Sequence, residues 1–227
     1  MSERQLHDNI AKLLDRVSRA AQNCERDPAD ITVLAVSKTR PAADIREAAA
    51  LGLDQFGENY LQEALDKIEA LRDLPLTWHF IGPIQSNKTR AIAGHFDWVH
   101  SVDRLKVARR LSEQRPDNLP PLQVCLQVNI SGEDSKSGAD LDALPELAAA
   151  VLELPRLTLR GLMAIPAATG DTAAQRAAFA RLRKAMTALG MPQLDTLSMG
   201  MSGDLEAAIA EGATIVRVGT DIFGPRG

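Results

Sequence analysis

Residues 31–52, ITVLAVSKTRPAADIREAAALG, contain one complete strand–helix unit of this chain. The run 31–37 is short, apolar and rich in β-branched residues, which is typical of a buried strand. The next run predicts a helix that begins at Pro41 and ends before Gly52, and these two residue types favour the start and the end of a helix. Because strands that alternate with helices form parallel sheets, this unit points to an α/β fold if it is repeated.

The same alternation recurs through the rest of the sequence. We expect strands at 31–37, 53–56, 77–81, 97–101, 122–129, 157–165, 194–199 and 213–218. Helices are expected at 2–24, 41–51, 60–71, 88–93, 103–113, 140–154, 171–189 and 204–211, the first of them an extra element before the first strand. Eight strands with intervening helices in 227 residues suit a single-domain (β/α)8 TIM barrel over 1–227. A doubly wound open sheet is the alternative.

Composition excludes several classes of protein. The 26 basic and 30 acidic side chains give a net charge of −4, which argues against nucleic acid as the main partner. The two cysteines, Cys24 and Cys125, exclude a disulfide scaffold and favour a reducing compartment. No membrane-spanning apolar run or secretory signal is apparent, and 4 % aromatic residues are few for a large interface. We therefore expect a soluble cytoplasmic monomer without a membrane partner.

Lys38 directly follows the strand predicted at 31–37. Active-site groups of (β/α)8 barrels gather at the carboxyl ends of the strands. Partial burial beside an apolar strand would lower the pKa of this amine and make it a nucleophile that forms a Schiff base with an aldehyde. The alternative is a solvated lysine at a strand-to-loop junction.

The segment 197–204, Leu-Ser-Met-Gly-Met-Ser-Gly-Asp, combines small residues with hydroxyl groups just before a predicted helix. Residues 217–220, Arg-Val-Gly-Thr, form a second such corner after the last strand. Loops at these two places often bind phosphate in barrels, because small residues and free N–H groups let an anion approach. The alternative is an ordinary helix cap made by Ser202 or Asp204.

Three other features have two interpretations each. Arg217 is predicted inside a strand, where it needs a carboxylate partner or a ligand at the barrel mouth. The run 56–60, Phe-Gly-Glu-Asn-Tyr, is either a polar strand end of the site or a helix cap. The polar loop 131–138, with Lys136, is either a flexible lid or a solvated loop.

The histidines give no metal motif. His79 could act as a base or contact a ligand, although a buried structural histidine is the more common case. His95 and His100 flank a predicted strand and are expected at the surface or at a junction. Because neither a Cys-x-x-Cys nor a His-Glu-x-x-His pattern is present, no metal site is expected.

Taken together, these segments resemble the YggS/PROSC family of pyridoxal phosphate homeostasis proteins. The matching stretches run in order from the first strand to the end of the chain, so the resemblance covers nearly all of it. They are 35–39 (AVSKT), 56–60 (FGENY), 78–82 (WHFIG) with Gln85 and 87–88 (NK), 161–163 (GLM), 197–204 (LSMGMSGD), 216–220 (VRVGT) and 222–224 (IFG).

The resemblance implies a barrel like the N-terminal domain of alanine racemase and the cofactor pyridoxal 5′-phosphate (PLP). It implies that Lys38 holds PLP as a Schiff base and that Arg217 faces the pyridine nitrogen. The phosphate would be held by Ser198, Ser202, Gly219 and Thr220. The other cofactor-binding residues that it implies are Asn59, His79, Met163 and Met199.

Physical chemistry then favours a carrier or buffer of PLP over an enzyme with dedicated catalytic residues. A cationic arginine at the pyridine nitrogen disfavours its protonation and so weakens the ring as an electron sink. One barrel uses all 227 residues and leaves none for the second domain of an alanine racemase, and Tyr60 is the only tyrosine. Transient contact with PLP-dependent apoenzymes would follow. The alternatives are a PLP-dependent amino-acid racemase of low activity and a cofactor-free Schiff-base aldolase.

Overall fold

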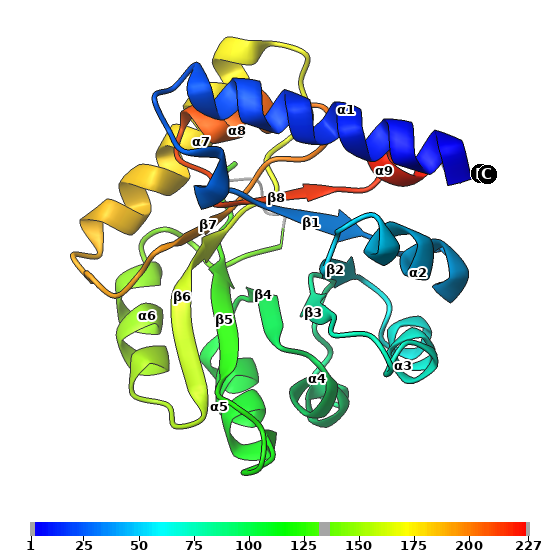
Figure 1. Cartoon of the computed structure of the whole chain (residues 1–227). Coiled ribbons are helices and arrows are strands. Elements are labelled where there is room, and N and C mark those ends of the chain that lie inside the picture. Colours follow the sequence, from blue (N-terminus) through cyan, green and yellow to red (C-terminus); the bar gives the residue numbers. More distant parts are fainter. Residues whose placement is uncertain (1–2, 132–136, 226–227) are drawn as a thin grey trace.

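Eight parallel strands close into a barrel in the order β1 to β8, as Figure 1 shows for the computed structural model, which describes residues 3–131 and 137–225. β1 pairs with β2 on one side and with β8 on the other, so the barrel is confirmed and the open sheet is wrong. The strands are β1 (Thr32–Val36), β2 (Gln55–Glu58), β3 (Thr77–Phe80), β4 (Trp98–Val102), β5 (Leu122–Gln127), β6 (Leu157–Met163), β7 (Thr196–Ser198) and β8 (Ile215–Val218).

Helices follow the strands around the outside of the barrel. They are α1 (Glu3–Gln22), α2 (Ala42–Ala50), α3 (Leu61–Ala70), α4 (Thr89–His95), α5 (Leu105–Gln114), α6 (Leu144–Leu152), α7 (Thr172–Ala188), α8 (Leu205–Ala210) and α9 (Thr220–Phe223). The short 3-10 helix Pro28–Asp30 and α9 were not expected. α6 begins four residues later than predicted, with a proline in its first turn, where its fixed backbone angle suits a helix start.

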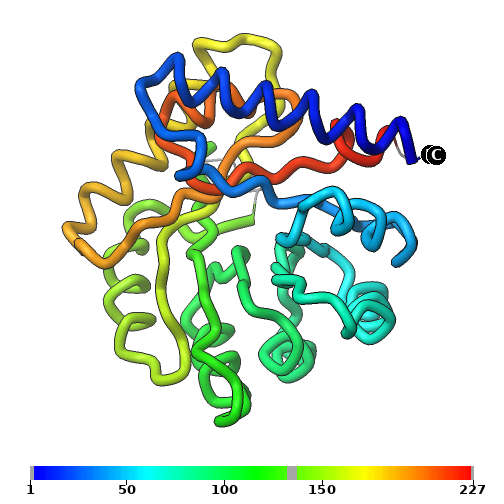
Figure 2. The backbone as a smooth tube through the Cα atoms, in the orientation of Figure 1, coloured from blue at the N-terminus to red at the C-terminus, as the bar shows by residue number. Residues whose placement is uncertain are grey.

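The extra helix α1 lies across the C-terminal part of the barrel. It packs against α8 and α9, and Figure 2 shows the blue start of the chain beside its red end. Six residues spaced three or four apart form its buried face, which is the pattern of an amphipathic helix. They are Leu6, Ile10, Leu13, Val17, Ala20 and Ala21. α1 therefore holds the loops around β7 and β8 from outside.

Alternation along the strands divides the interior into two layers. A small apolar cluster of Leu34, Ile81 and Ile215 lies inside the barrel, with Val36 and Trp98 packed against it. The much larger apolar core lies between the strands and the surrounding helices. The barrel interior also contains buried polar side chains, which form part of the site described below.

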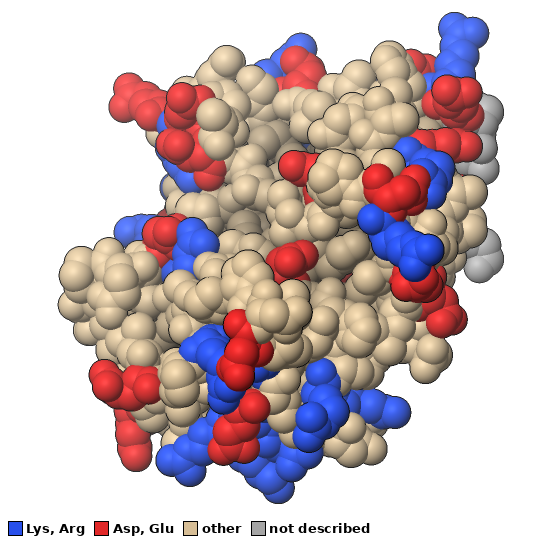
Figure 3. Space-filling model, turned by 60° about the horizontal axis from the view of Figure 1, so that its bottom comes forward, with Lys and Arg blue, Asp and Glu red and all other residues tan. Residues whose placement is uncertain are grey.

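The surface carries charges of both signs. In the view of Figure 3, Lys and Arg side chains are concentrated toward the lower edge, with Asp and Glu among them. Among the described residues, no helix combines the length and the apolar character needed to cross a bilayer. Most of the polar loop expected at 131–138, including Lys136, falls outside the described residues.

Candidate cofactor pocket

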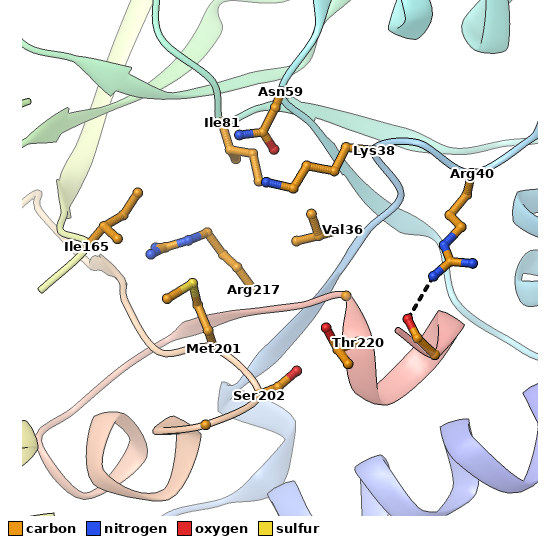
Figure 4. Close-up of a pocket in the computed structure, with 13 residues that line it drawn as sticks. Val36, Lys38, Arg40, Asn59, Ile81, Ile165, Met201, Ser202, Arg217 and Thr220 are labelled. Carbon is orange, nitrogen blue, oxygen red and sulfur yellow. Dashed lines mark hydrogen bonds between the residues drawn. The ribbon is translucent and has the colours of Figure 1, made fainter. Parts of the chain in front are cut away.

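A pocket of about 230 Å³ opens at the carboxyl ends of the strands. Its lining comes from the ends of β1, β2, β3, β6, β7 and β8 or from the loops that follow them, so residues far apart in the sequence meet there (Figure 4). Of the ten predicted cofactor residues, six line it: Lys38, Asn59, Ser202, Arg217, Gly219 and Thr220. Its other lining residues, which the sequence did not single out for this role, are Val36, Arg40, Ile81, Ile165, Met201, Gly203 and Gly224.

Lys38 supplies a primary amine to the middle of this pocket. Figure 4 shows its side chain reaching inward from the end of β1, with its tip near Asn59 and Ile81. The Asn59 side-chain oxygen is buried and has no hydrogen-bond partner among the described residues. A buried acceptor of this kind is costly unless a ligand or water donates to it, so its position favours an occupant with a donor group.

Two loops with small residues and hydroxyl groups form the opposite wall. Ser202 and Gly203 follow β7, and Gly219 and Thr220 follow β8. The first loop is closed by Asp204, whose Oδ1 accepts a hydrogen bond of 2.6 Å from the Met201 amide. Glycines let a ligand approach the main chain, and hydroxyls donate to an anion, so this wall has the chemistry of a phosphate cradle.

Arg16 of α1 joins the two loops from behind. Its Nη2 donates to the Ser202 carbonyl oxygen at 2.8 Å, and its Nη1 donates to Asp221 Oδ2 at 2.6 Å. A pair with Glu206 of α8 completes the contact. Nothing in the sequence marked Arg16, because its role depends on packing α1 beside the end of the chain.

The other four predicted cofactor residues do not line the pocket. Met163, Ser198 and Met199 are fully buried, and His79 is 1 % exposed. The ring of His79 stacks on Trp98 with centroids 5.4 Å apart inside the barrel. His79 is therefore packed inside the barrel and is not part of the pocket lining.

A chain of hydrogen bonds runs from Arg217 through the interior of the barrel. Arg217 Nη1 donates to Ser198 Oγ at 2.7 Å, and Ser198 Oγ lies 2.7 Å from His100 Nδ1. His100 Nε2 lies 2.8 Å from His79 Nδ1, and His79 Nε2 lies 2.8 Å from Gln55 Oε1. Because the Gln55 oxygen only accepts, His79 Nε2 carries a proton. With both rings neutral, His100 Nε2 donates to His79 Nδ1, and Ser198 donates to His100 Nδ1.

Burial favours that neutral state. It lowers the pKa of His79 from 6.5 to about 3. It also lowers the pKa of His100 well below 6.5, and the positive charge of Arg217 acts in the same direction. The expectation that His100 lies at the surface or at a junction is wrong, because it lies inside β4, two residues after the inward-facing Trp98. That spacing was the available signal.

Arg217 uses its guanidinium both for the barrel and for the pocket. Besides Ser198, it donates from Nη2 to the Ala164 carbonyl oxygen at 2.9 Å. Burial lowers its pKa to about 10, and the negative charge of Asp204 opposes that shift, so it stays charged at neutral pH. Within the described chain it forms no ion pair, so the barrel-mouth alternative fits and the carboxylate-partner alternative does not.

Comparison with known proteins assigns the family. A family model described as the alanine racemase N-terminal domain matches residues 9–227. The pyridoxal phosphate homeostasis protein of Pseudomonas aeruginosa is 68 % identical over 219 residues, which cover 96 % of this chain and 95 % of that protein. The chain belongs to the pyridoxal phosphate homeostasis protein family. The family member of Escherichia coli K12 is 56 % identical over 223 residues, which cover 96 % of this chain and 95 % of that protein.

Solved structures agree with this assignment to the family. PipY of Synechococcus elongatus, with PLP bound, is 40 % identical and superimposes with a TM-score of 0.85, over 96 % of this chain and 100 % of PipY. PipY without PLP gives a TM-score of 0.87 with the same identity and coverage. An alanine racemase from E. faecalis is only 16 % identical, with a TM-score of 0.73, and covers 100 % of this chain and 59 % of its own. That likeness shows the shared barrel fold.

Proposed function

We propose that this protein binds PLP in the pocket and serves intracellular PLP homeostasis as a carrier of the cofactor. Lys38 would form the Schiff base, and Ser202, Gly203, Gly219 and Thr220 would hold the phosphate. One observation carries the proposal: a primary amine and a wall of hydroxyls and glycines face the same pocket (Figure 4). The PLP-bound structure of PipY supports it, because PipY shares the fold and 40 % of the sequence.

The other polar lining residues fit the same group. The unpartnered oxygen of Asn59 can accept a hydrogen bond from a donor on the cofactor. The fixed positive charge of Arg217 opposes the protonation of any basic nitrogen placed beside it. When bound, PLP supplies an aldehyde that condenses with amines and a ring that withdraws electrons from the attached carbon. A ring nitrogen held beside Arg217 would therefore stay unprotonated, which would weaken the electron withdrawal that most PLP enzymes need.

Racemisation needs an acid–base side chain on each face of the substrate. Among the described lining residues, the ionisable side chains are Lys38, Arg40 and Arg217. Tyr60, the only tyrosine of the chain, lines a neighbouring cavity and is 52 % exposed. We therefore propose a carrier without dedicated catalysis.

The test begins with the purified wild-type protein and PLP. We expect an absorbance band of a Schiff base, and borohydride reduction should fix one PLP on a peptide that contains Lys38. A protein that takes up no PLP, or that fixes it elsewhere, contradicts the proposal. Deuterium exchange at the α-carbon of L-alanine separates the carrier from the racemase, because a carrier shows no exchange above that of free PLP.

The surface around the pocket and the state of the cysteines bear on the partners and the cellular compartment of the protein. An open mouth rimmed by Ile165 and Met201, which are 43 % and 39 % exposed, suits release of PLP to PLP-dependent apoenzymes in transient contact. Cys24 and Cys125 are free thiols, and burial raises the pKa of Cys125 to about 12. An unreactive buried thiol suits a reducing cytoplasm. We propose a cytoplasmic monomer with no nucleic acid partner.

Replacing Arg16 with Met is expected to weaken PLP binding about fivefold, because a partly exposed charged contact that aligns both phosphate loops is lost. Binding of pyridoxal, which lacks the phosphate, should not change. Titration of both ligands measures the difference. Arg19→Met is the matched control, because Arg19 lies on the same helix and pairs with Asp15 in solvent. Equal losses for PLP and pyridoxal would contradict a role at the phosphate.

A further inference from the structure

The main chain around Lys38 takes an unusual path. Thr39, the next residue, has a φ of 65°, in the left-handed region that β-branched residues rarely adopt. Such a conformation costs on the order of 1–3 kcal/mol and persists only where neighbouring contacts enforce it. Contacts with neighbouring residues must therefore hold Thr39 in this conformation.

Side chains along β1 point alternately into the barrel and toward the surrounding helices. Leu34 and Val36 face the barrel interior, so Ser37 faces the surrounding helices and Lys38 faces inward again. Ser37 is fully buried on that outer side, and its Oγ donates to Glu58 Oε1 at 2.6 Å. The direction of Lys38 thus depends on how firmly its two neighbours are held.

A charge cluster of buried Glu58, buried Lys67 and partly exposed Glu63 holds both neighbours. Lys67 Nζ, on α3, donates to the Ser37 carbonyl oxygen at 2.8 Å and to Glu58 Oε1 at 2.8 Å. It also donates to Glu63 Oε1 at 2.5 Å. That same Glu63 oxygen accepts a hydrogen bond of 2.5 Å from the Thr39 amide. One ammonium group therefore links the contacts on both sides of Lys38.

Removing the charges of this cluster from water costs free energy. The side chains of Glu58 and Lys67 are 0 % and 6 % exposed, and Glu58 Oε2 is buried with no partner among the described residues. Burial raises the pKa of Glu58, although the hydrogen bonds from Lys67 and Ser37 oppose the shift. Buried ion pairs are often no more stable than apolar packing of the same size, so a gain in stability does not by itself account for this cluster.

We propose that Glu58, Glu63 and Lys67 are positioning residues for Lys38, fixing Ser37 and Thr39 so that its amine points into the cofactor pocket. The inference rests on the proposed PLP site. The cluster does not line that pocket, so it acts through the main chain. It therefore governs formation of the bond to Lys38 and leaves the phosphate wall unchanged.

Glu63→Ala tests this most directly, because Glu63 is partly exposed and its removal leaves Glu58 paired with Lys67. The probes are PLP, which can bond to Lys38, and pyridoxine 5′-phosphate, whose alcohol cannot. For Glu63→Ala we expect PLP to bind about tenfold more weakly and to form the trapped adduct more slowly, because misplacing a reacting group is costly. Its affinity for pyridoxine 5′-phosphate should equal that of the wild type.

Two further variants sharpen the result. Glu63→Gln keeps the oxygen that accepts from Thr39, so it should recover most of the PLP affinity. Glu69→Ala is the matched control, since Glu69 lies on the same helix and pairs with Arg72 in solvent. Equal losses for both probes, or no loss for PLP, would overturn the positioning role. A wild type that binds neither probe would instead overturn the proposed PLP site.

Discussion

Lys38→Ala is expected to abolish the adduct that borohydride fixes on this protein. The amine of Lys38 is the nucleophile that we place in the pocket, and alanine cannot replace it. The phosphate wall, built from Ser202, Gly203, Gly219 and Thr220, is untouched by the change. The variant should therefore keep binding pyridoxine 5′-phosphate while its spectrum with PLP stays that of the free aldehyde.

Mass spectrometry after reduction measures this result. Lys106→Ala is the control, because Lys106 is exposed on α5 and is not part of the pocket lining. It should fix one PLP per chain, as the wild type does. An adduct that persists at wild-type level in Lys38→Ala would show that another amine holds the cofactor.

Acid is expected to destabilise the folded protein through its two buried histidines. His79 and His100 are neutral in the folded chain, because burial lowers the pKa of His79 to about 3 and that of His100 well below 6.5. In the unfolded chain both return to the ordinary value of about 6.5. As the pH falls below that value, the unfolded state takes up protons that the folded state refuses, so stability is lost from about pH 6.5 downward.

The size of the effect follows from the shift. Between about pH 7.5 and about pH 5.5, His79 lowers the free energy of unfolding by about 1.4 kcal/mol, and His100 acts in the same direction. Other groups titrate over the same range, so the comparison must be made against variants. Urea unfolding at the two pH values gives the free energies.

Matched variants isolate the histidines. His79→Gln should remove the contribution of His79 from the pH-dependent loss, about 1.4 kcal/mol, whatever its effect on stability at neutral pH. His7→Gln and His95→Gln, which replace exposed histidines, are the substitution controls. Identical pH dependence in His79→Gln and the wild type would mean that the buried ring is not neutral in the folded chain.

The proposed cofactor pocket is connected to the two buried histidines. Arg217 lies at the pocket end of the hydrogen-bond chain that contains both histidines. A proton on His100 would place a second positive charge beside Arg217 and remove the acceptor for Ser198. This repulsion adds to burial in keeping the ring of His100 neutral in the folded chain.

Local sequence patterns were sufficient for the fold and for part of the pocket lining. Short runs typical of strands alternate with runs typical of helices eight times. Such units close into a barrel because each strand must bury both faces. Strand-end position pointed to Lys38, and loop composition pointed to Ser202, Gly219 and Thr220, since carboxyl ends of parallel strands meet at one edge. The family resemblance added Asn59. None of these required knowledge of long-range contacts.

Local patterns could not predict how deep a side chain lies along the barrel axis. Strands of a barrel are tilted and staggered, so two residues at the ends of their own strands lie at different heights. Ser198 ends β7 but lies below the pocket, where Arg217 covers it, and His79 lies deeper still against Trp98. A sequence shows which face a residue occupies but not which layer.

The sequence by itself determined the barrel, the lysine at the end of its first strand and the hydroxyl-rich loops after its last two, because each depends on neighbours within a few residues. Only the tertiary structure decided which groups hold them in place. Arg16 reaches the phosphate loops across about the whole length of the chain, and Lys67 reaches the residues beside Lys38 from the helix after the next strand. Such contacts come from packing helices around a closed barrel, which no local pattern encodes.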